Sequence, residues 1–412
     1  MASTIKVTNI DTPDGSGNIT VDRPLSGSGA SLTALNASEL GSGTLPMARL
    51  SGTLPALNGS ALTNLPSTPI RNYIIDGDFT QWPTGTSFAS STTYGPALWQ
   101  VSNASAQAVL TVTRDTDVPT VAQSNHQSKY SVKYDVTTAD SSIGAAERVS
   151  ALYAITGSDI NCLFGQQCTI AFWVKSTKTG TFTIGLLNAS GNRSMPLEYT
   201  ISSSNTWEYK TITFTMDNTG TWGLTEADVG MYIHIFLASG SNYDGTNQTW
   251  SATDNYSTSN QVNAVDSTSN NFFLSQVGLY LGSSAPDFTS PPIATVKKQV
   301  AWYFQNEGES DLTWKWAGIG GVTTTSTMSC KVQYAGGAMR AIPTITSSAA
   351  GTWYASDHNT GGTATAISFS GTAKDRTLIS ISYGSSGWGI GNVGYFMRNN
   401  ATTTYLYLDA RH

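Results

Sequence analysis

The stretch GMYIHIFLAS (Gly230 to Ser239) alternates along its length with period two, as a strand with one face in a core should. AFWVKS (Ala171 to Ser176) and YKTITFTMD (Tyr209 to Asp217) show the same alternation of apolar with polar or aromatic residues. Turn signals such as Lys178-Thr-Gly and Asp217-Asn-Thr-Gly separate these segments. Several strands at spacings of roughly ten residues predict an antiparallel sandwich of the jelly-roll type.

Composition and the pattern of apolar residues divide the 412-residue chain into four parts. We expect a repeat segment over residues 1–70, a jelly roll over 71–290, a linker helix over 291–306 and a second antiparallel β-sandwich module over 307–412. The helix is predicted because Pro291-Pro292 can begin it and Ile293, Val296, Val300 and Phe304 share one helical face. The alternation of the second module lies in QYAGGAMRAIPTITSS (Gln333 to Ser348), TATAISFSGT (Thr363 to Thr372), RTLISISYG (Arg376 to Gly384) and TTTYLYLDA (Thr402 to Ala410). The predicted fold class is therefore mainly β.

The N-terminal segment has a different composition from the rest of the chain. No aromatic residue precedes Tyr73, and phrases such as SLTALNASEL (Ser31 to Leu40) set single Leu residues among Gly, Ser, Thr, Asn and Pro. Side chains this small cannot bury enough apolar area to offset the entropy of ordering the segment. We therefore expect several copies of the chain to wind together and share their Leu residues.

The net charge of the chain and the spacing of its cysteines argue against several classes of function. Charged residues are 12% of the chain and the net charge is −6, which argues against binding to nucleic acid or insertion at an anionic membrane. Cys162, Cys168 and Cys330 show no metal-binding spacing, and a Cys162–Cys168 disulfide is an alternative to buried free thiols. No metal site and no cofactor are predicted. The start of the chain lacks a secretion signal and no window is long and apolar enough to span a bilayer, so synthesis in a cytoplasm is expected.

Several phrases, in this order along the chain, resemble the tail fibres and receptor-binding proteins of tailed bacteriophages. The phrases are LNASELGSGTLPMARLSGTLP (Leu35 to Pro55), NYIIDGDFTQWPTGTSF (Asn72 to Phe88), YGPALWQV (Tyr94 to Val101), FFLSQVGLYLGSSAPDF (Phe272 to Phe288), AWYFQ (Ala301 to Gln305), MRAIPTIT (Met339 to Thr346) and YLYLDARH (Tyr405 to His412). The segment from Asn72 to Phe288 resembles a carbohydrate-binding-module-like jelly roll, although Tyr280 stands where the closing strand is often acidic.

This resemblance implies a homotrimeric fibre of the virion, made in the host cytoplasm. Its N-terminus would attach to other tail or baseplate proteins, and its C-terminal domains would bind a host cell-surface glycan. No nucleic acid and no membrane insertion are implied.

Glycan recognition needs aromatic faces beside amide, carboxylate and hydroxyl groups on loops held by a rigid scaffold. Two loops of the second module have this make-up, and Trp388 between glycines is expected to be exposed; the alternative is that these Trp residues fill a core or a trimer axis. Aromatic residues on the loops of the jelly roll are candidates for a second glycan-binding surface. The favoured alternative is that they close the ends of the sandwich core. The candidates are Trp353, Tyr354, Asp357, His358 and Trp388 in the second module, and Trp222, Tyr243, Trp250 and Tyr256 in the jelly roll.

Two other functions compete with that of an adhesin. A glycan-cleaving tailspike would need two carboxylates across the scissile bond, but the closest pair, Asp76 and Asp78, is explained by a turn beside Gly77. The protein is therefore not expected to be an enzyme. A connector or decoration fibre without receptor binding is the remaining alternative. His234, which alternates within a strand, is more typical of a satisfied core histidine than of a ligand-binding residue.

Overall fold

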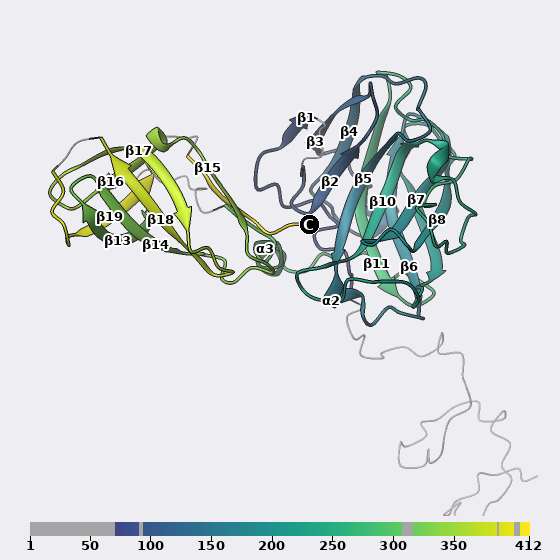
Figure 1. Ribbon diagram of the computed structural model, residues 1–412. Coiled ribbons are helices and arrows are strands. Elements are labelled where there is room, and N and C mark those ends of the chain that lie inside the picture. The colour runs from purple at the N-terminus through teal and green to yellow at the C-terminus, as the bar shows by residue number, and fades with distance from the viewer. Residues whose placement is uncertain (1–70, 90–93, 307–315, 385–386, 399–403) are drawn as a thin grey trace, which may run out of the picture. The chain divides into compact units, whose positions relative to one another are not determined.

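The computed structural model describes residues 71–89, 94–306, 316–384, 387–398 and 404–412. The repeat segment predicted for residues 1–70 lies outside the described residues. The predicted mainly β fold class, with antiparallel sheets, is confirmed (Figure 1). None of the helices in the described ranges has the length and apolar character that crossing a bilayer requires.

The jelly roll consists of two packed antiparallel sheets, and its strands include the three segments in which the alternation was found. One sheet has six strands in the order β1-β3-β4-β11-β6-β9, and the other has five in the order β2-β5-β10-β7-β8 (Figure 1). The strands are β1 (Ser87–Ala89), β2 (Trp99–Asn103), β3 (Val109–Asp115), β4 (Ser131–Thr138), β5 (Arg148–Thr156), β6 (Gln167–Ser176), β7 (Gly180–Asn188), β8 (Ser194–Ile201), β9 (Glu208–Thr215), β10 (Val229–Ser239) and β11 (Asn271–Leu281). The loops contain α1 (Val121–Ser124), α2 (Gly157–Ile160) and the 3-10 helix η5 (Ser241–Tyr243).

The space between the two sheets holds the apolar core of this module. From β10, Met231, Ile233 and Ile235 are buried in that core. Side chains of a strand alternate between its two faces, so the residues between them, Tyr232 and His234, belong to the outer face of the five-stranded sheet. An outer face with aromatic residues is unusual for a sheet that meets only water.

The entry phrase of the jelly roll forms a turn, as expected from the sequence. Asp76 and Phe79 adopt left-handed backbone conformations with φ of 54° and 51°, and the Phe79 amide donates to the Asp76 carbonyl at 3.0 Å. The Asp76 carboxylate accepts hydrogen bonds from Thr80 and Gln81, whereas Asp78 accepts them from Ser128 and Ser290 and pairs with His126. Both carboxylates thus hold the turn and its neighbours.

The linker helix begins where the sequence predicts. Helix α3 (Ile293–Ala301) follows Pro292 directly and buries Val296 and Val300. The helix ends at Ala301 rather than at residue 306, because β12 (Phe304–Asn306) pairs with β20 (Leu406–Asp409). With β15 (Thr344–Ser347) these strands form a three-stranded sheet in the order β12-β20-β15.

The second module, expected to be an antiparallel β-sandwich, contains antiparallel strands that close into a barrel. The barrel order is β13-β14-β18-β17-β16-β19, and β13 closes it by pairing with both β14 and β19. An added Cβ at Gly320 would lie 1.9 Å from the Ser329 carbonyl oxygen, so only glycine allows β13 to approach β14 so closely. The bounds are β13 (Trp316–Thr324), β14 (Thr327–Gln333), β16 (Trp353–Ser356), β17 (Gly361–Ser370), β18 (Arg376–Tyr383) and β19 (Val393–Arg398), with the 3-10 helix η6 (Ala350–Thr352) before β16.

The cysteines are free thiols, so the alternative of a Cys162–Cys168 disulfide is not realised. Cys168 and Cys330 are buried, and Cys162 contacts the Tyr73 hydroxyl at 3.0 Å. Among the residues that the structure describes, no group of three His, Cys, Asp or Glu side chains is placed to hold a metal ion.

Candidate functional site

A hollow of about 280 Å³ lies on the outer face of the five-stranded sheet, and we call it the outer-face pocket. Its floor is apolar and aromatic, and its rim carries amide, hydroxyl, guanidinium and imidazole groups. Its lining residues are Tyr94, Leu98, Gln100, Ser102, Arg148, Leu152, Ala154, Leu187, Tyr232, His234, Tyr256 and His412. This volume lies just below the range of small-ligand pockets, which begins at about 300 Å³.

The strand register brings together lining residues of the outer-face pocket that are far apart in the sequence. Gln100 on β2 is opposite Leu152 on β5, and Leu152 is opposite His234 on β10. One step along the sheet, Ala154 and Leu187 flank Tyr232 from its two sides. Opposed residues on one face of an antiparallel pair lie in contact distance, so these rows form a continuous surface.

The long loop between β10 and β11 covers the other half of this sheet face. The Tyr256 ring of this loop lies 5.1 Å from the His234 ring and 5.6 Å from the Phe236 ring. An added Cβ at Gly185 on β7 would lie 2.4 Å from the Tyr256 carbonyl oxygen. Glycine at this position therefore lets the loop lie directly on the sheet, and Tyr256 becomes one wall of the pocket.

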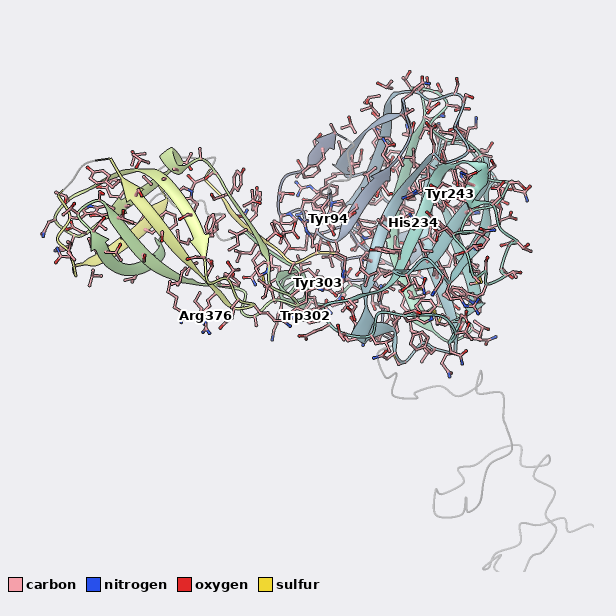
Figure 2. The ribbon with its side chains drawn as sticks, viewed as in Figure 1. Tyr94, His234, Tyr243, Trp302, Tyr303 and Arg376 are labelled. Atoms are coloured by element: carbon pink, nitrogen blue, oxygen red, sulfur yellow. The ribbon has the colours of Figure 1, made fainter. Side chains whose placement is uncertain are left out.

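Arg148 and Tyr243 stand together beside this wall. The Arg148 Nη1 donates to the Tyr243 hydroxyl at 2.7 Å, and the Tyr243 hydroxyl donates to the Ala146 carbonyl at 3.0 Å. The Tyr243 ring lies 5.3 Å from the Tyr256 ring. Figure 2 shows Tyr94, His234 and Tyr243 on the jelly roll, distributed across the region of this sheet.

The opposite wall comes from the last residues of the sequence. The His412 carbonyl oxygen accepts hydrogen bonds from the Tyr94 hydroxyl at 2.6 Å and from the Gln100 Nε2 at 3.0 Å. Its imidazole Nδ1 accepts from Arg340 at 2.8 Å, and its Nε2 lies 3.3 Å from the Thr156 hydroxyl. The pocket is thus completed by a residue that follows β20, the final strand of the second module.

The two histidines of the pocket are held in their neutral form. Burial, together with the charge of Arg148, lowers the pKa of His234 to about 3. Burial, together with the charge of Arg340, lowers the pKa of His412 to about 3. His234 Nδ1 shares a hydrogen bond of 2.9 Å with the Ser150 hydroxyl, which confirms it as a buried, satisfied histidine.

Because His234 binds a proton in the unfolded chain below about pH 6.5 but in the folded chain only near pH 3, stability should fall as the pH falls through this interval. We expect His234→Gln to remove this contribution to the pH dependence of stability. Between pH 7 and pH 5 the wild type should lose about 2 kcal/mol more free energy of unfolding than this variant. Urea unfolding at both pH values measures the difference. His358→Asn, which changes an exposed histidine, is the control, and parallel curves for wild type and His234→Gln would contradict the prediction.

Trp353 and Trp388 lie in the core of the second module, so the expected exposure of Trp388 is wrong. Trp353 is 1% exposed and stacks on Phe396 with ring centroids 4.5 Å apart. Trp388 is 2% exposed, stacks on Tyr383 and donates its indole N–H to the Thr360 carbonyl at 3.1 Å. The flanking glycines supply no neighbours, but Tyr383 at the end of β18 and Thr360 do. Glycan binding by these two residues stays a prediction that their burial does not support.

The two loops of the second module that were predicted to bind glycan lie together, and Asp357 connects them. Its carboxylate accepts from the Thr360 amide at 2.8 Å on one loop and from the Gly389 amide at 2.9 Å on the other. These hydrogen bonds hold the pKa of Asp357 well below its usual range. Asp357 is itself buried, whereas Tyr354 is half-buried and His358 is exposed in a left-handed conformation. The Asp357 carboxylate therefore holds the two loops together.

The four candidates in the jelly roll separate into two pairs. Tyr243 and Tyr256 lie at the outer-face pocket, as described above. The Trp222 and Trp250 rings contact each other at 5.9 Å, pack against the sandwich core and donate their indole N–H groups to the Thr219 and Thr215 carbonyls. These two residues close the end of the core, and they do not line the pocket.

The residues that sequence reasoning missed are Tyr94, Gln100, Arg148 and Tyr232. The signal for Tyr232 was present, because the outward positions of GMYIHIFLAS carry Tyr232, His234 and Phe236 where a water-facing strand would be polar. Tyr94 and Gln100 lay within a quoted phrase. Arg148 had no such signal, since only the fold brings it to Tyr243 and His234.

No family model matches this chain, and no curated relative matches it. Solved structures with a similar arrangement include the enzymatically active domain of tailspike protein 4 from bacteriophage CBA120, at 17% identity and a TM-score of 0.27. That match covers 45% of this chain and 19% of the tailspike chain. A carbohydrate-binding module named TmCBM61, in complex with β-1,4-galactotriose, matches at 13% identity and a TM-score of 0.26, covering 52% of this chain and 99% of its own. The N-terminal cellulose-binding domain of a Cellulomonas fimi β-1,4-glucanase matches at 16% identity and a TM-score of 0.25, covering 49% of this chain and 99% of its own.

Proposed function

We propose that this protein binds a carbohydrate in the outer-face pocket of its jelly roll. The observation that carries the proposal is the combination of a floor made by Tyr232, Leu152 and Leu187 with a polar rim that includes Gln100 and Arg148. Aromatic and apolar side chains match the C–H faces of sugar rings, and fixed amide and guanidinium groups match their hydroxyls. The rigid sheet below positions all of them without a large ordering cost on binding.

Binding without cleavage is the form of the proposal that the pocket supports. None of the side chains that line it in the described residues is acidic, whereas glycoside hydrolysis uses two carboxylates across the bond. The Asp76 and Asp78 carboxylates are engaged in the entry turn. We therefore place the protein among adhesins rather than among glycan-cleaving tailspikes.

The biological setting is proposed from the phrases that resemble phage tail fibres. We infer a homotrimeric fibre of the virion that attaches through residues 1–70 to other tail proteins and binds a host surface glycan. Support comes from the aromatic-free, Leu-bearing start of the chain. Light scattering of the full-length chain tests the assembly, and a stable monomer would contradict it. A connector fibre without receptor binding is the alternative, and failure to bind any glycan would favour it.

Replacement of Tyr232 by alanine should lower the affinity for glycan by about tenfold or more, because its ring is one of the aromatic faces that line the pocket. The measurement is binding of the full-length chain to a panel of purified bacterial surface polysaccharides. Each polysaccharide is tested before and after mild periodate oxidation, which opens sugar rings. Wild-type binding that oxidation abolishes is the expected result.

The matched control for this prediction is Tyr209→Ala. Tyr209 is 45% exposed on β9 of the other sheet, with its ring 5.4 Å from that of Trp173. Its loss should leave glycan binding unchanged. Equal losses of affinity in both variants would place the site elsewhere, and no effect of Tyr232→Ala would remove the outer-face pocket from the proposal.

A further inference from the structure

We propose that the carbohydrate taken by the outer-face pocket carries a carboxylate, which the guanidinium of Arg148 holds. This inference rests on the proposed carbohydrate binding and names the class of sugar. It begins from the charge balance of the pocket: its lining residues in the described chain include one arginine and no acidic side chain.

Arg148 lacks a charge partner of its own among the described residues. Its neighbour Glu147 is engaged elsewhere, since that carboxylate accepts from the amides of Ala106 at 2.9 Å and Gly144 at 2.8 Å. None of the ion pairs in the described ranges includes Arg148. A guanidinium that faces a pocket and has no ion-pair partner attracts an anion from solution.

The hydrogen-bonding geometry of Arg148 agrees with this charge balance. Its Nη1 is used by the Tyr243 hydroxyl, whereas its Nε is buried without an acceptor within the described part of the chain. No acceptor for Nη2 is present there either. Nη2 is therefore the nitrogen of this guanidinium that is left to donate a charge-assisted hydrogen bond to a bound carboxylate.

The other charged side chains near the pocket, among them Arg340 and Arg411, do not line it. Arg411 pairs with Asp409 at 2.6 Å, with its guanidinium over the Tyr94 ring at 3.7 Å. Asp254 acts on Tyr256 electrostatically but does not line the pocket. The two histidines that line it, His234 and His412, are neutral, as shown above. Arg148 is thus the charge that a bound sugar meets.

A matched pair of ligands separates this inference from the proposed function. Purified bacterial polysaccharides rich in uronic acids are used in native form and after carbodiimide activation and borohydride reduction, which convert each carboxylate to a primary alcohol. The full-length chain should bind the native form at least about tenfold more tightly than the reduced form, as expected for hydrogen bonds to a charged group. Arg148→Gln should lose that preference and bind the native and reduced forms with equal affinity, and Arg148→Lys should keep part of the preference.

Arg114→Gln is the control, because it removes the same charge from β3 of the opposite sheet, where the guanidinium lies over the Tyr130 ring at 4.3 Å. It should behave as the wild type. Equal binding of native and reduced polysaccharides by the wild type would overturn the carboxylate inference and leave carbohydrate binding intact. Binding of neither form would overturn both. If Arg148→Gln still preferred the native over the reduced polysaccharide, a residue other than Arg148 would hold the carboxylate.

Discussion

Arg340→Met lowers the free energy of unfolding by about 3 kcal/mol, because it removes a buried donor from several acceptors at once. The Arg340 Nε donates to the Glu226 carbonyl at 3.0 Å, and its Nη2 donates to the Ala227 carbonyl at 2.5 Å and to His412. Its Nη1 donates to the Ala410 carbonyl at 2.5 Å. Arg340 is 3% exposed. Methionine fills similar space but donates nothing, so these acceptors lose their partner, and the carbonyl of the buried Ala410 is left without a donor from Arg340.

The same substitution should free the final residues of the sequence, because Arg340 connects the 226–227 loop of the jelly roll with Ala410 and His412. Urea unfolding of the full-length chain measures the stability loss, and hydrogen exchange measures the protection of the amide of Ala410, which donates to the Tyr303 carbonyl at 2.8 Å. Arg376→Met is the matched control, since Arg376 is 51% exposed at its side chain and pairs only loosely with Asp375 at 3.5 Å. Equal stability and equal protection in the two variants would contradict this role for Arg340.

Trp353→Ala should cost about 3 to 5 kcal/mol of unfolding free energy, the usual range for removing a buried aromatic residue. The Trp353 ring is stacked on Phe396 in the core of the barrel, so alanine would leave a cavity there. Trp353→Phe should cost much less, because it keeps an aromatic ring and removes an indole N–H that has no acceptor among the described residues. Thermal unfolding followed by tryptophan fluorescence compares the two variants.

This experiment also decides between the two roles considered for Trp353. A core residue gives a large stability loss with alanine and a small one with phenylalanine. A glycan-binding residue would give a stable alanine variant that no longer binds polysaccharide. The second outcome would return the loops of the second module to the candidate sites and weaken the case for the outer-face pocket.

Local pattern was enough to predict several elements of this fold. The period-two alternation of GMYIHIFLAS placed β10, and Pro291-Pro292 placed the start of α3. Tyr243 and Tyr256 were found as candidates because both lie in a long loop between strands. The predictions of β10 and α3 succeeded because strand alternation and helix initiation depend on residues close together in the sequence.

The composition of the site was decided only by the tertiary structure. Gln100, Leu152 and His234 form one row because three strands pair in a particular register, and His412 completes the pocket by hydrogen bonds to Tyr94 and Gln100. The burial of Trp353 and Trp388 and the closure of the barrel have the same origin, since each depends on neighbours supplied by distant strands. The sequence by itself determined which segments are strands, whereas the packing of those strands decided which residues line the outer-face pocket, because burial and electrostatic environment depend on neighbours in space.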